Sequence, residues 1–207
     1  MTRRLRIALA TTASILCLAT AATAFWYQDW QYSLPTPRPD GLEQPAVGTR
    51  LDLAAILGHP LAARPLWIHV VNTACPCSRF NIDHVRSLIR QFGNRFTVVT
   101  LVQGDDDPQT LVTSFKDLGL ATKVIADPGG RLAARLGVYS TPQAVVTTAE
   151  GRLYFRGNYN SSRYCADRRT EFARIAMQAM LDGAPPPAMP PEALVAYGCP
   201  LPRRRQS

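Results

Sequence analysis

Two cysteines separated by one residue, Cys75 and Cys77, stand in the stretch NTACPCSRF (residues 72–80), where an apolar run gives way to an amphipathic one. Cysteines at such spacing serve as a redox dithiol, as a clamp for a soft metal ion, or as parts of structural disulfides. Cys75 precedes a predicted helix, whose unpaired backbone N–H groups and dipole favour a thiolate. We therefore predict that Cys75 is the attacking thiol of the pair.

The elements around the cysteines alternate in type. The predicted strands are residues 65–71, 95–103 and 122–126, and the predicted helices are residues 78–93, 107–119, 130–137 and 167–183. Residues 143–148 and 152–157 flank turn residues 149–151 and predict a hairpin. Alternating strands and helices imply parallel pairing through right-handed crossovers, to which the hairpin adds antiparallel strands. The predicted fold is therefore α/β, with a mixed central sheet between helices.

Three features resemble the thioredoxin-like superfamily, in its membrane-anchored, exported thiol-disulfide oxidoreductase and redoxin branch. They are the motif ACPCSRF, the run ADPGGRLAARLGVYSTPQAVV, and the hairpin followed by a last helix. The resemblance covers about residues 47–183 and implies a thioredoxin-like three-layer sandwich. It also implies that Thr141-Pro142 is a cis peptide bond beside the dithiol, with the Thr141 backbone left to pair with an extended substrate. The sequence departs from the C-x-x-C pattern, because Ser78 stands where the family has its second cysteine.

The proposed cycle is thiol-disulfide exchange with a protein disulfide or dithiol substrate. Cys75 attacks, and Cys77 or Cys165 resolves the mixed disulfide. In an alternative alignment Cys77 takes the resolving position and Ala74 occupies the place of the nucleophile. The loop before Cys165 follows a strand that returns to the edge of the sheet near the dithiol, so Cys165 is either a resolving thiol or half of a structural bridge to Cys199. The structural bridge is the favoured reading for an exported chain.

Copper handling is the main alternative. Two thiolates one residue apart suit Cu(I), with His84 as a third ligand of a metallochaperone. However, His84 falls among apolar helix positions and is predicted to be a packed residue, and His59 and His69 lack partners at ligand spacing. No cofactor is expected in the leading reading. A redox-silent thioredoxin-like binding module is the third reading.

The N-terminal segment carries Arg3, Arg4 and Arg6 and then no charged residue from Ile7 to Gln28. This length is compatible with one transmembrane helix, with the arginines on the cytoplasmic side and the aromatic residues after Ala24 at the far interface. The expected location is a membrane-anchored domain outside the cytoplasm, which is the periplasm in a bacterium. A cleaved signal peptide with secretion to the same compartment is the alternative, since Ala22-Thr23-Ala24 fits a cleavage site.

Five segments follow from composition. They are a basic end (1–6), the anchor or signal segment (7–28), a proline-rich tether (29–48), the thioredoxin-like domain (49–183) and a proline-rich tail with Cys199 (184–207). The net charge of +8 includes six arginines at the two ends, among them Arg203, Arg204 and Arg205. Because the rest of the chain is nearly balanced, a nucleic-acid partner is not expected. A membrane, and a separate electron donor or acceptor in it, are the expected partners besides the protein substrate.

Overall fold

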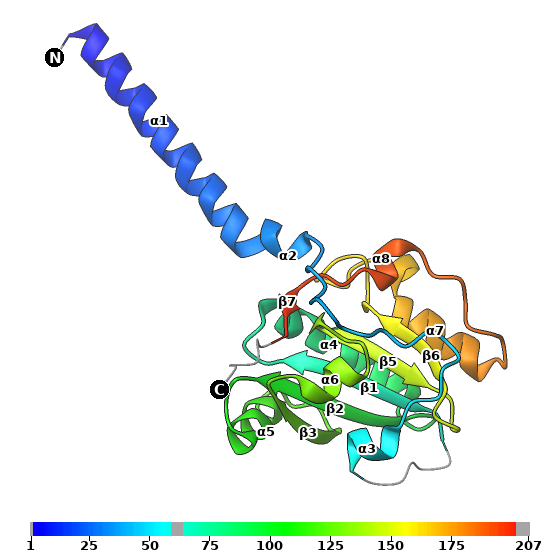
Figure 1. Ribbon diagram of the computed structural model, residues 1–207. Coiled ribbons are helices and arrows are strands. Elements are labelled where there is room, and N and C mark those ends of the chain that lie inside the picture. Colours follow the sequence, from blue (N-terminus) through cyan, green and yellow to red (C-terminus); the bar gives the residue numbers. More distant parts are fainter. Residues whose placement is uncertain (1, 59–63, 202–207) are drawn as a thin grey trace. The chain divides into compact units, whose positions relative to one another are not determined.

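The computed structural model describes residues 2–58 and 64–201 of the chain (Figure 1). His59 and Arg203 to Arg205 lie outside the described residues. The chain divides into two compact units, Met1–Leu34 and Pro35–Ser207.

The first unit is helical. It consists of α1 (Arg3–Phe25), a π-helical turn η1 (Trp26–Trp30) and α2 (Gln31–Ser33). The stretch Arg3–Ser33 has a mean hydropathy of 1.8 in its most apolar window and is long and apolar enough to cross a membrane. The predicted anchor, residues 7–28, lies within this stretch, and a signal sequence would have the same composition.

The second unit is built on a five-stranded sheet of order β3-β2-β1-β5-β6. The strands are β1 (Leu66–Asn72), β2 (Thr97–Gly104), β3 (Lys123–Pro128), β5 (Gln143–Thr147) and β6 (Leu153–Gly157). The three strands β1, β2 and β3 are mutually parallel, whereas β5 is antiparallel to both β1 and β6. The mixed sheet and its terminal hairpin are therefore as predicted from the sequence.

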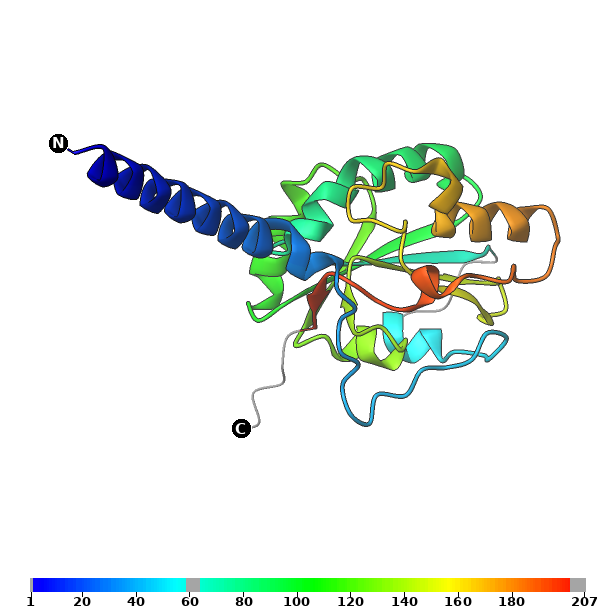
Figure 2. The ribbon, with the colours of Figure 1, turned by 90° about the horizontal axis from the view of Figure 1, so that it is seen from above.

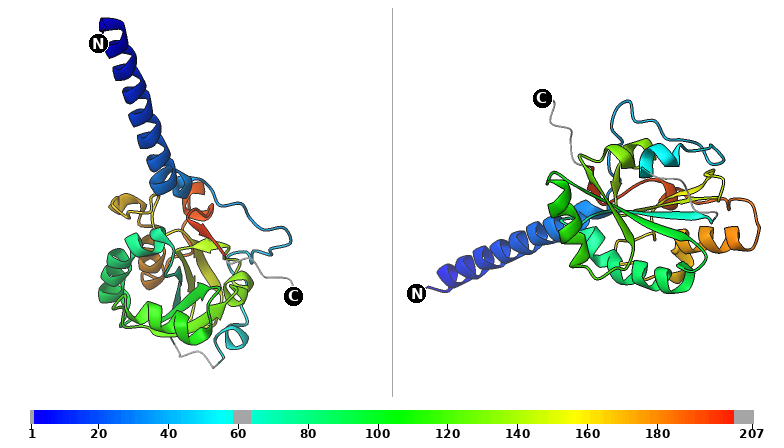
Figure 3. Two further views of the ribbon diagram at one scale, coloured as in Figure 1. Left: turned by 90° about the vertical axis from the view of Figure 1, so that its left-hand side faces the viewer. Right: turned by 90° about the horizontal axis from the view of Figure 1, so that it is seen from below.

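Helices cover both faces of this sheet. On one face lie α4 (Pro76–Phe92), α5 (Pro108–Lys116) and α7 (Phe172–Leu181), and on the other lie α3 (Leu53–Leu57) and α6 (Arg131–Arg135), as Figures 2 and 3 show. Side chains of β1 alternate between the two cores: Trp67 contributes to the α4 side and Ile68 to the α6 side, and both are fully buried. The predicted thioredoxin-like three-layer sandwich is confirmed.

The element boundaries differ slightly from the predicted ones. The helix predicted over residues 167–183 begins with a 3-10 turn, η2 (Arg168–Thr170), before α7. Asp107 begins α5 as its N-cap, because its carboxylate accepts hydrogen bonds from the backbone N–H groups of Gln109 and Thr110.

The proline-rich segments on either side of the sandwich are part of the domain. The tail contains α8 (Pro191–Leu194) and β7 (Cys199–Pro200), and the two-residue strand β4 (Ser140–Thr141) pairs with β7. The backbone N–H of Thr36, in the predicted tether, donates to the carbonyl of Ala196, in the tail, at 2.8 Å. The compact unit Pro35–Ser207 thus extends beyond the predicted domain of 49–183 at both ends. A proline-rich chain has few N–H groups with which to pair its own carbonyls, so side chains of the sandwich donate to them instead. For example, the Tyr154 hydroxyl group donates to the carbonyl of Ala184 at 2.8 Å.

Candidate redox site

Cys75 stands at the junction of β1 and α4, as its N-cap residue. Two hydrogen bonds from Asn72 shape the connecting loop: its carbonyl accepts from the N–H of Cys75 at 3.0 Å, and its side-chain Oδ1 accepts from the N–H of Ala74 at 2.9 Å. Pro76 occupies the first helical position, where the missing N–H group of proline costs no hydrogen bond within the helix. Cys75 is only 2% exposed. The helix N-terminus next to it favours the thiolate form once the sulfur is reduced.

In the structure Cys75 forms a disulfide with Cys199, with a Cα–Cα distance of 5.9 Å. The predicted bridge between Cys165 and Cys199 is therefore wrong, and Cys77 is not the disulfide partner of Cys75. The physical reason is the pairing of β7 with β4, which places Cys199 directly opposite Thr141. The Sγ atom of Cys75 lies 3.6 Å from the carbonyl oxygen of that same Thr141. The tail therefore places Cys199 at the edge of β4, next to Cys75, where the sequence predicts only the Cys75/Cys77 dithiol.

The peptide bond between Thr141 and Pro142 is cis, as predicted from the resemblance. Thr141 is fully buried, and it lies in β4 directly before β5. The Thr141 backbone, which the resemblance leaves to pair with a substrate, is paired in the structure with the tail of this chain.

Cys77 and Cys165 both lie near the tail as thiols. Cys77 is fully buried in the first turn of α4. Cys165 donates its S–H to Oδ1 of Asn81, which lies on α4 like Cys77, at 3.1 Å. The loop before Cys165 therefore returns to the edge near the candidate site, as predicted. Burial, with a smaller contribution from Glu171, raises the pKa of Cys165 to about 12, so this thiol is protonated at neutral pH.

Tyr197 connects these thiols with the tail. Burial raises the pKa of its phenol, and the neighbouring Cys165 and Cys77 raise it further. Its hydroxyl group donates to the carbonyl of Asn160 at 2.6 Å. Tyr197 therefore lies close to both remaining thiols of the domain and is anchored to the loop that carries Cys165.

The side chains considered for copper do not form a ligand set. Nδ1 of His84 lies 3.9 Å from Oε1 of Glu171, and its ring packs edge-on against Tyr159. Burial lowers the pKa of His84. Within residues 2–58 and 64–201, no group of three or more His, Cys, Asp or Glu side chains is arranged to hold a metal ion. His84 is thus a packed helix residue, as the apolar pattern predicted.

Residues 55–200 match a sequence family described as a domain of unknown function, DUF6436. The chain belongs to this DUF6436 family. The matched region includes Cys75, Pro142 and Cys199, so the whole candidate site lies within the family domain. Among curated proteins, none matches the chain.

Two of the solved structures that match the chain share the fold of this DUF6436 domain, with TM-scores above 0.6. A hypothetical protein from Sinorhizobium meliloti 1021 is 18% identical with a TM-score of 0.63, covering 79% of this chain and 97% of its own. An uncharacterized conserved protein from Geobacillus kaustophilus is 16% identical with a TM-score of 0.64, covering 84% of this chain and 100% of its own. A secreted disulfide oxidoreductase of Mycobacterium tuberculosis, homologous to E. coli DsbE, is 20% identical with a TM-score of 0.39, covering 45% of this chain and 68% of its own.

A buried polar network beneath the site was not predicted from the sequence. The indole N–H of Trp67 donates to the hydroxyl oxygen of Tyr159 at 3.1 Å, and that hydroxyl lies 2.8 Å from Nδ1 of His69. The Tyr159 hydroxyl group therefore joins the indole of Trp67 to the imidazole of His69. Burial lowers the pKa of His69 to about 3, so the ring is neutral in the folded protein.

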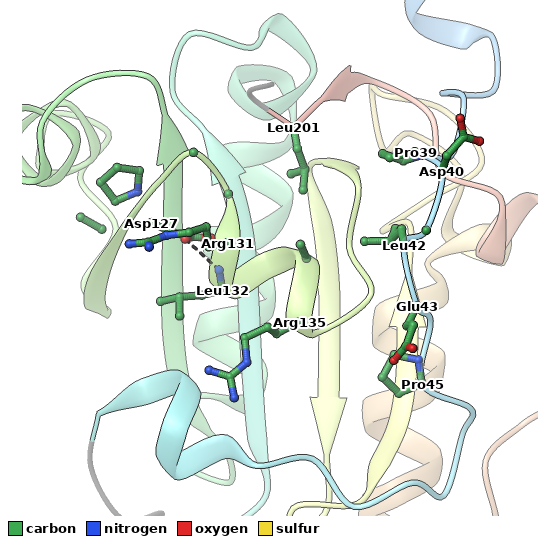
Figure 4. A pocket seen from close by; sticks show the side chains of 16 residues that line it. Pro39, Asp40, Leu42, Glu43, Pro45, Asp127, Arg131, Leu132, Arg135 and Leu201 are labelled. Carbon is green, nitrogen blue, oxygen red and sulfur yellow. Dashed lines mark hydrogen bonds between the residues drawn. The ribbon is translucent and has the colours of Figure 1, made fainter. Parts of the chain in front are cut away.

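An open groove of about 1300 Å³ lies beside the end of the tail (Figure 4). Its lining includes residues 39–43, Pro45, side chains of α6 and Leu201. The lining residue Asp127 accepts hydrogen bonds from the backbone N–H groups of Leu132 and Ala133 at 2.9 Å each. The tail therefore contributes at the same time to the disulfide, through Cys199, and to the wall of a groove, through Leu201.

Proposed function

We propose that this DUF6436 protein carries out thiol-disulfide exchange with a protein partner, using Cys75 as the attacking thiol and Cys199 as its redox partner. The observation that carries the proposal is the Cys75–Cys199 disulfide at the N-terminus of α4, next to Thr141-Pro142. This assignment replaces Cys77 and Cys165 as resolving residues by Cys199.

The proposed reaction starts from the reduced protein. The Cys75 thiolate attacks one sulfur of a substrate disulfide, forms a mixed disulfide and releases the other substrate sulfur as a thiolate, which takes up a proton. Cys199 then loses its proton, attacks the Cys75 sulfur and releases the second substrate thiol. The substrate disulfide gains two electrons and the two cysteines of the protein lose two. The reverse sequence oxidises a substrate dithiol.

The location proposed for this reaction is outside the cytoplasm, on a membrane anchor. The apolar stretch Arg3–Ser33 and the arginines at its start support this orientation. Disulfides persist in exported compartments, where a resting Cys75–Cys199 bond would be kept. Turnover requires a second dithiol or disulfide partner, and we place that electron donor or acceptor in the membrane.

Thiol trapping in the native membrane tests the function. The Cys199→Ser variant retains the attacking thiol and lacks its proposed resolving thiol, so it should accumulate mixed disulfides through Cys75. The Cys75→Ser variant should accumulate none, and Cys165→Ser, as the matched control, should resemble the unmodified protein. Mixed disulfides that form equally in the Cys75→Ser variant would exclude Cys75 as the attacking residue.

The alternatives predict different outcomes for the same variants. A copper(I) metallochaperone would retain one Cu(I) per chain after purification under reducing conditions, and Cys75→Ser or Cys77→Ser would abolish it. A redox-silent module would trap no partner in any variant and would keep the Cys75–Cys199 bond in a glutathione redox buffer across the physiological range.

A further inference from the structure

The tail occupies the edge of β4 as an additional strand. Strand β7 runs antiparallel to β4, with Ser140 opposite Pro200 and Thr141 opposite Cys199. One residue further, the N–H of Leu201 donates to the carbonyl of Tyr139 at 3.1 Å. The edge that could pair with another polypeptide is therefore filled by the chain's own residues.

Gly198 approaches this edge more closely than any residue with a side chain could. Its φ is +110°, and a Cβ atom placed on it would lie 2.3 Å from the carbonyl oxygen of Thr141. That contact is with backbone, which has little freedom to move in a buried strand. The edge thus requires glycine directly before the cysteine of whatever segment pairs with it.

The remaining contacts of the tail at this edge are made with its backbone. The Ser140 hydroxyl oxygen lies 3.0 Å from the carbonyl oxygens of both Tyr197 and Cys199, and it shares its hydrogen between them. The hydroxyl of Thr36 lies 3.1 Å from that of Ser140 and 3.4 Å from the carbonyl oxygen of Gly198. Because Ser140 and Thr36 contact carbonyl oxygens, another extended chain with a glycine-cysteine pair would meet the same groups, and would lack only side-chain contacts such as that of Tyr197 with Asn160.

We propose that the β4 edge is the docking site for an extended polypeptide that carries glycine directly before its reactive cysteine, and that residues 196–201 occupy this site until the Cys75–Cys199 bond is reduced. This inference rests on the proposed function and specifies its substrate. The tail and a substrate strand exclude each other, since both need the same backbone atoms of Thr141. A substrate strand can therefore pair with this edge only in the reduced protein, in which the tail can be exchanged for it.

The exchange can be followed with two peptides. Blocked Tyr-Gly-Cys-Pro and Tyr-Ala-Cys-Pro, each as a mixed disulfide with glutathione, are added to the full-length Cys199→Ser variant, in which Cys75 is reduced. The Cys75 thiolate attacks the peptide sulfur, forms a Cys75-peptide disulfide and releases glutathione thiolate. We expect the glycine peptide to form this adduct at least about tenfold faster than the alanine peptide, as measured by intact mass. Oxidised unmodified protein should form no such adduct on the same timescale.

Controls separate failure of this inference from failure of the proposed function. Oxidised glutathione serves as a small disulfide that needs no strand pairing. If Cys75 reacts with oxidised glutathione, but the two peptides react at equal rates or not at all, the docking inference is overturned and the exchange function stands. If Cys75 reacts with none of the three disulfides, the proposed function itself is overturned.

Discussion

Thr141 lies directly opposite Cys199 in an antiparallel strand pair, and the same Cys199 is bonded to Cys75. Backbone pairing and a covalent bond thus hold the same short segment in one place. The two are thermodynamically linked: whatever weakens the strand pairing makes the disulfide easier to reduce, and reduction weakens the pairing by the same free energy. Redox state and access to the β4 edge are therefore coupled in this protein.

Substitution of Gly198 tests this coupling. In Gly198→Ala the new methyl group meets the Thr141 carbonyl, so the tail should dock less well by about 1 to 3 kcal/mol. Because docking favours the oxidised form, the reduction potential of the Cys75–Cys199 bond should rise by about 20 to 60 mV in a glutathione titration. Gly183→Ala is the matched control, since Gly183 also has a positive φ, +72°, with nothing within 4 Å of its Cβ position. Equal potentials in both variants would contradict the coupling.

Ser140 tests the polar contacts of the same segment. Ser140→Ala leaves the carbonyl groups of Tyr197 and Cys199 without their hydroxyl partner, at a cost of about 1 to 2 kcal/mol. The amide of Leu201, which is protected by its bond to Tyr139, should then exchange with solvent about tenfold faster in the oxidised protein, while amides of β1 should be unaffected. Ser114→Ala, which removes contacts with Thr73 and Leu111 instead, should leave Leu201 exchange unchanged. Unchanged Leu201 exchange in Ser140→Ala would show that this hydroxyl does not hold the tail.

The sandwich could be predicted from the sequence, whereas the tail could not. The strand residues 65–71 and the helix residues 78–93 have regular apolar patterns, and the burial of β1 and α4 follows them closely. Residues 184–201 have no such pattern, because hydrogen bonds of their backbone carbonyls and a few irregularly spaced apolar side chains, such as Ala193, hold them on the domain. Periodicity therefore predicts no place for the tail on the domain and points to Cys77 and Cys165, rather than Cys199, as partners of Cys75.

One signal for the tail was present in the sequence. Gly198-Cys199-Pro200 combines a residue for close backbone approach, a thiol and a residue without an N–H group at the edge of a sheet. Its significance depends on the place where it docks, and that place is set by β4, a strand of only two residues. Pairing between two such short strands follows from the packing of the whole domain.

Cys165 should make the protein sensitive to alkali. Burial, and to a lesser extent Glu171, raise the pKa of this thiol from 9.0 to about 12 in the folded state. The unfolded chain therefore loses this proton more readily, so the contribution of Cys165 to stability is complete below pH 9 and is lost as the pH rises to 12. The free energy of unfolding in urea should fall less steeply between pH 9 and pH 11 in Cys165→Ser than in the unmodified protein. Parallel curves would contradict this. Burial is the main cause of the raised pKa values of Tyr159 and Tyr197 and remains in the variant, and loss of the smaller contribution of Cys165 to both values makes the fall less steep still.

His69 should make the stability of the folded protein sensitive to acid. Its pKa is lowered from 6.5 to about 3 by burial, so the unfolded chain binds a proton at pH values where the folded protein does not. Stability should therefore decrease as the pH falls from 6.5 towards 3. In His69→Gln the free energy of unfolding should change less between pH 7 and pH 4, although its value at pH 7 is lower because the contact with Tyr159 is altered.

Tyr159→Phe is the control: it removes the hydroxyl group but leaves His69 buried, so the full dependence on pH should remain. A His69→Gln protein as sensitive to acid as the unmodified one would place the titrating group elsewhere, with His84 the first candidate because burial also lowers its pKa.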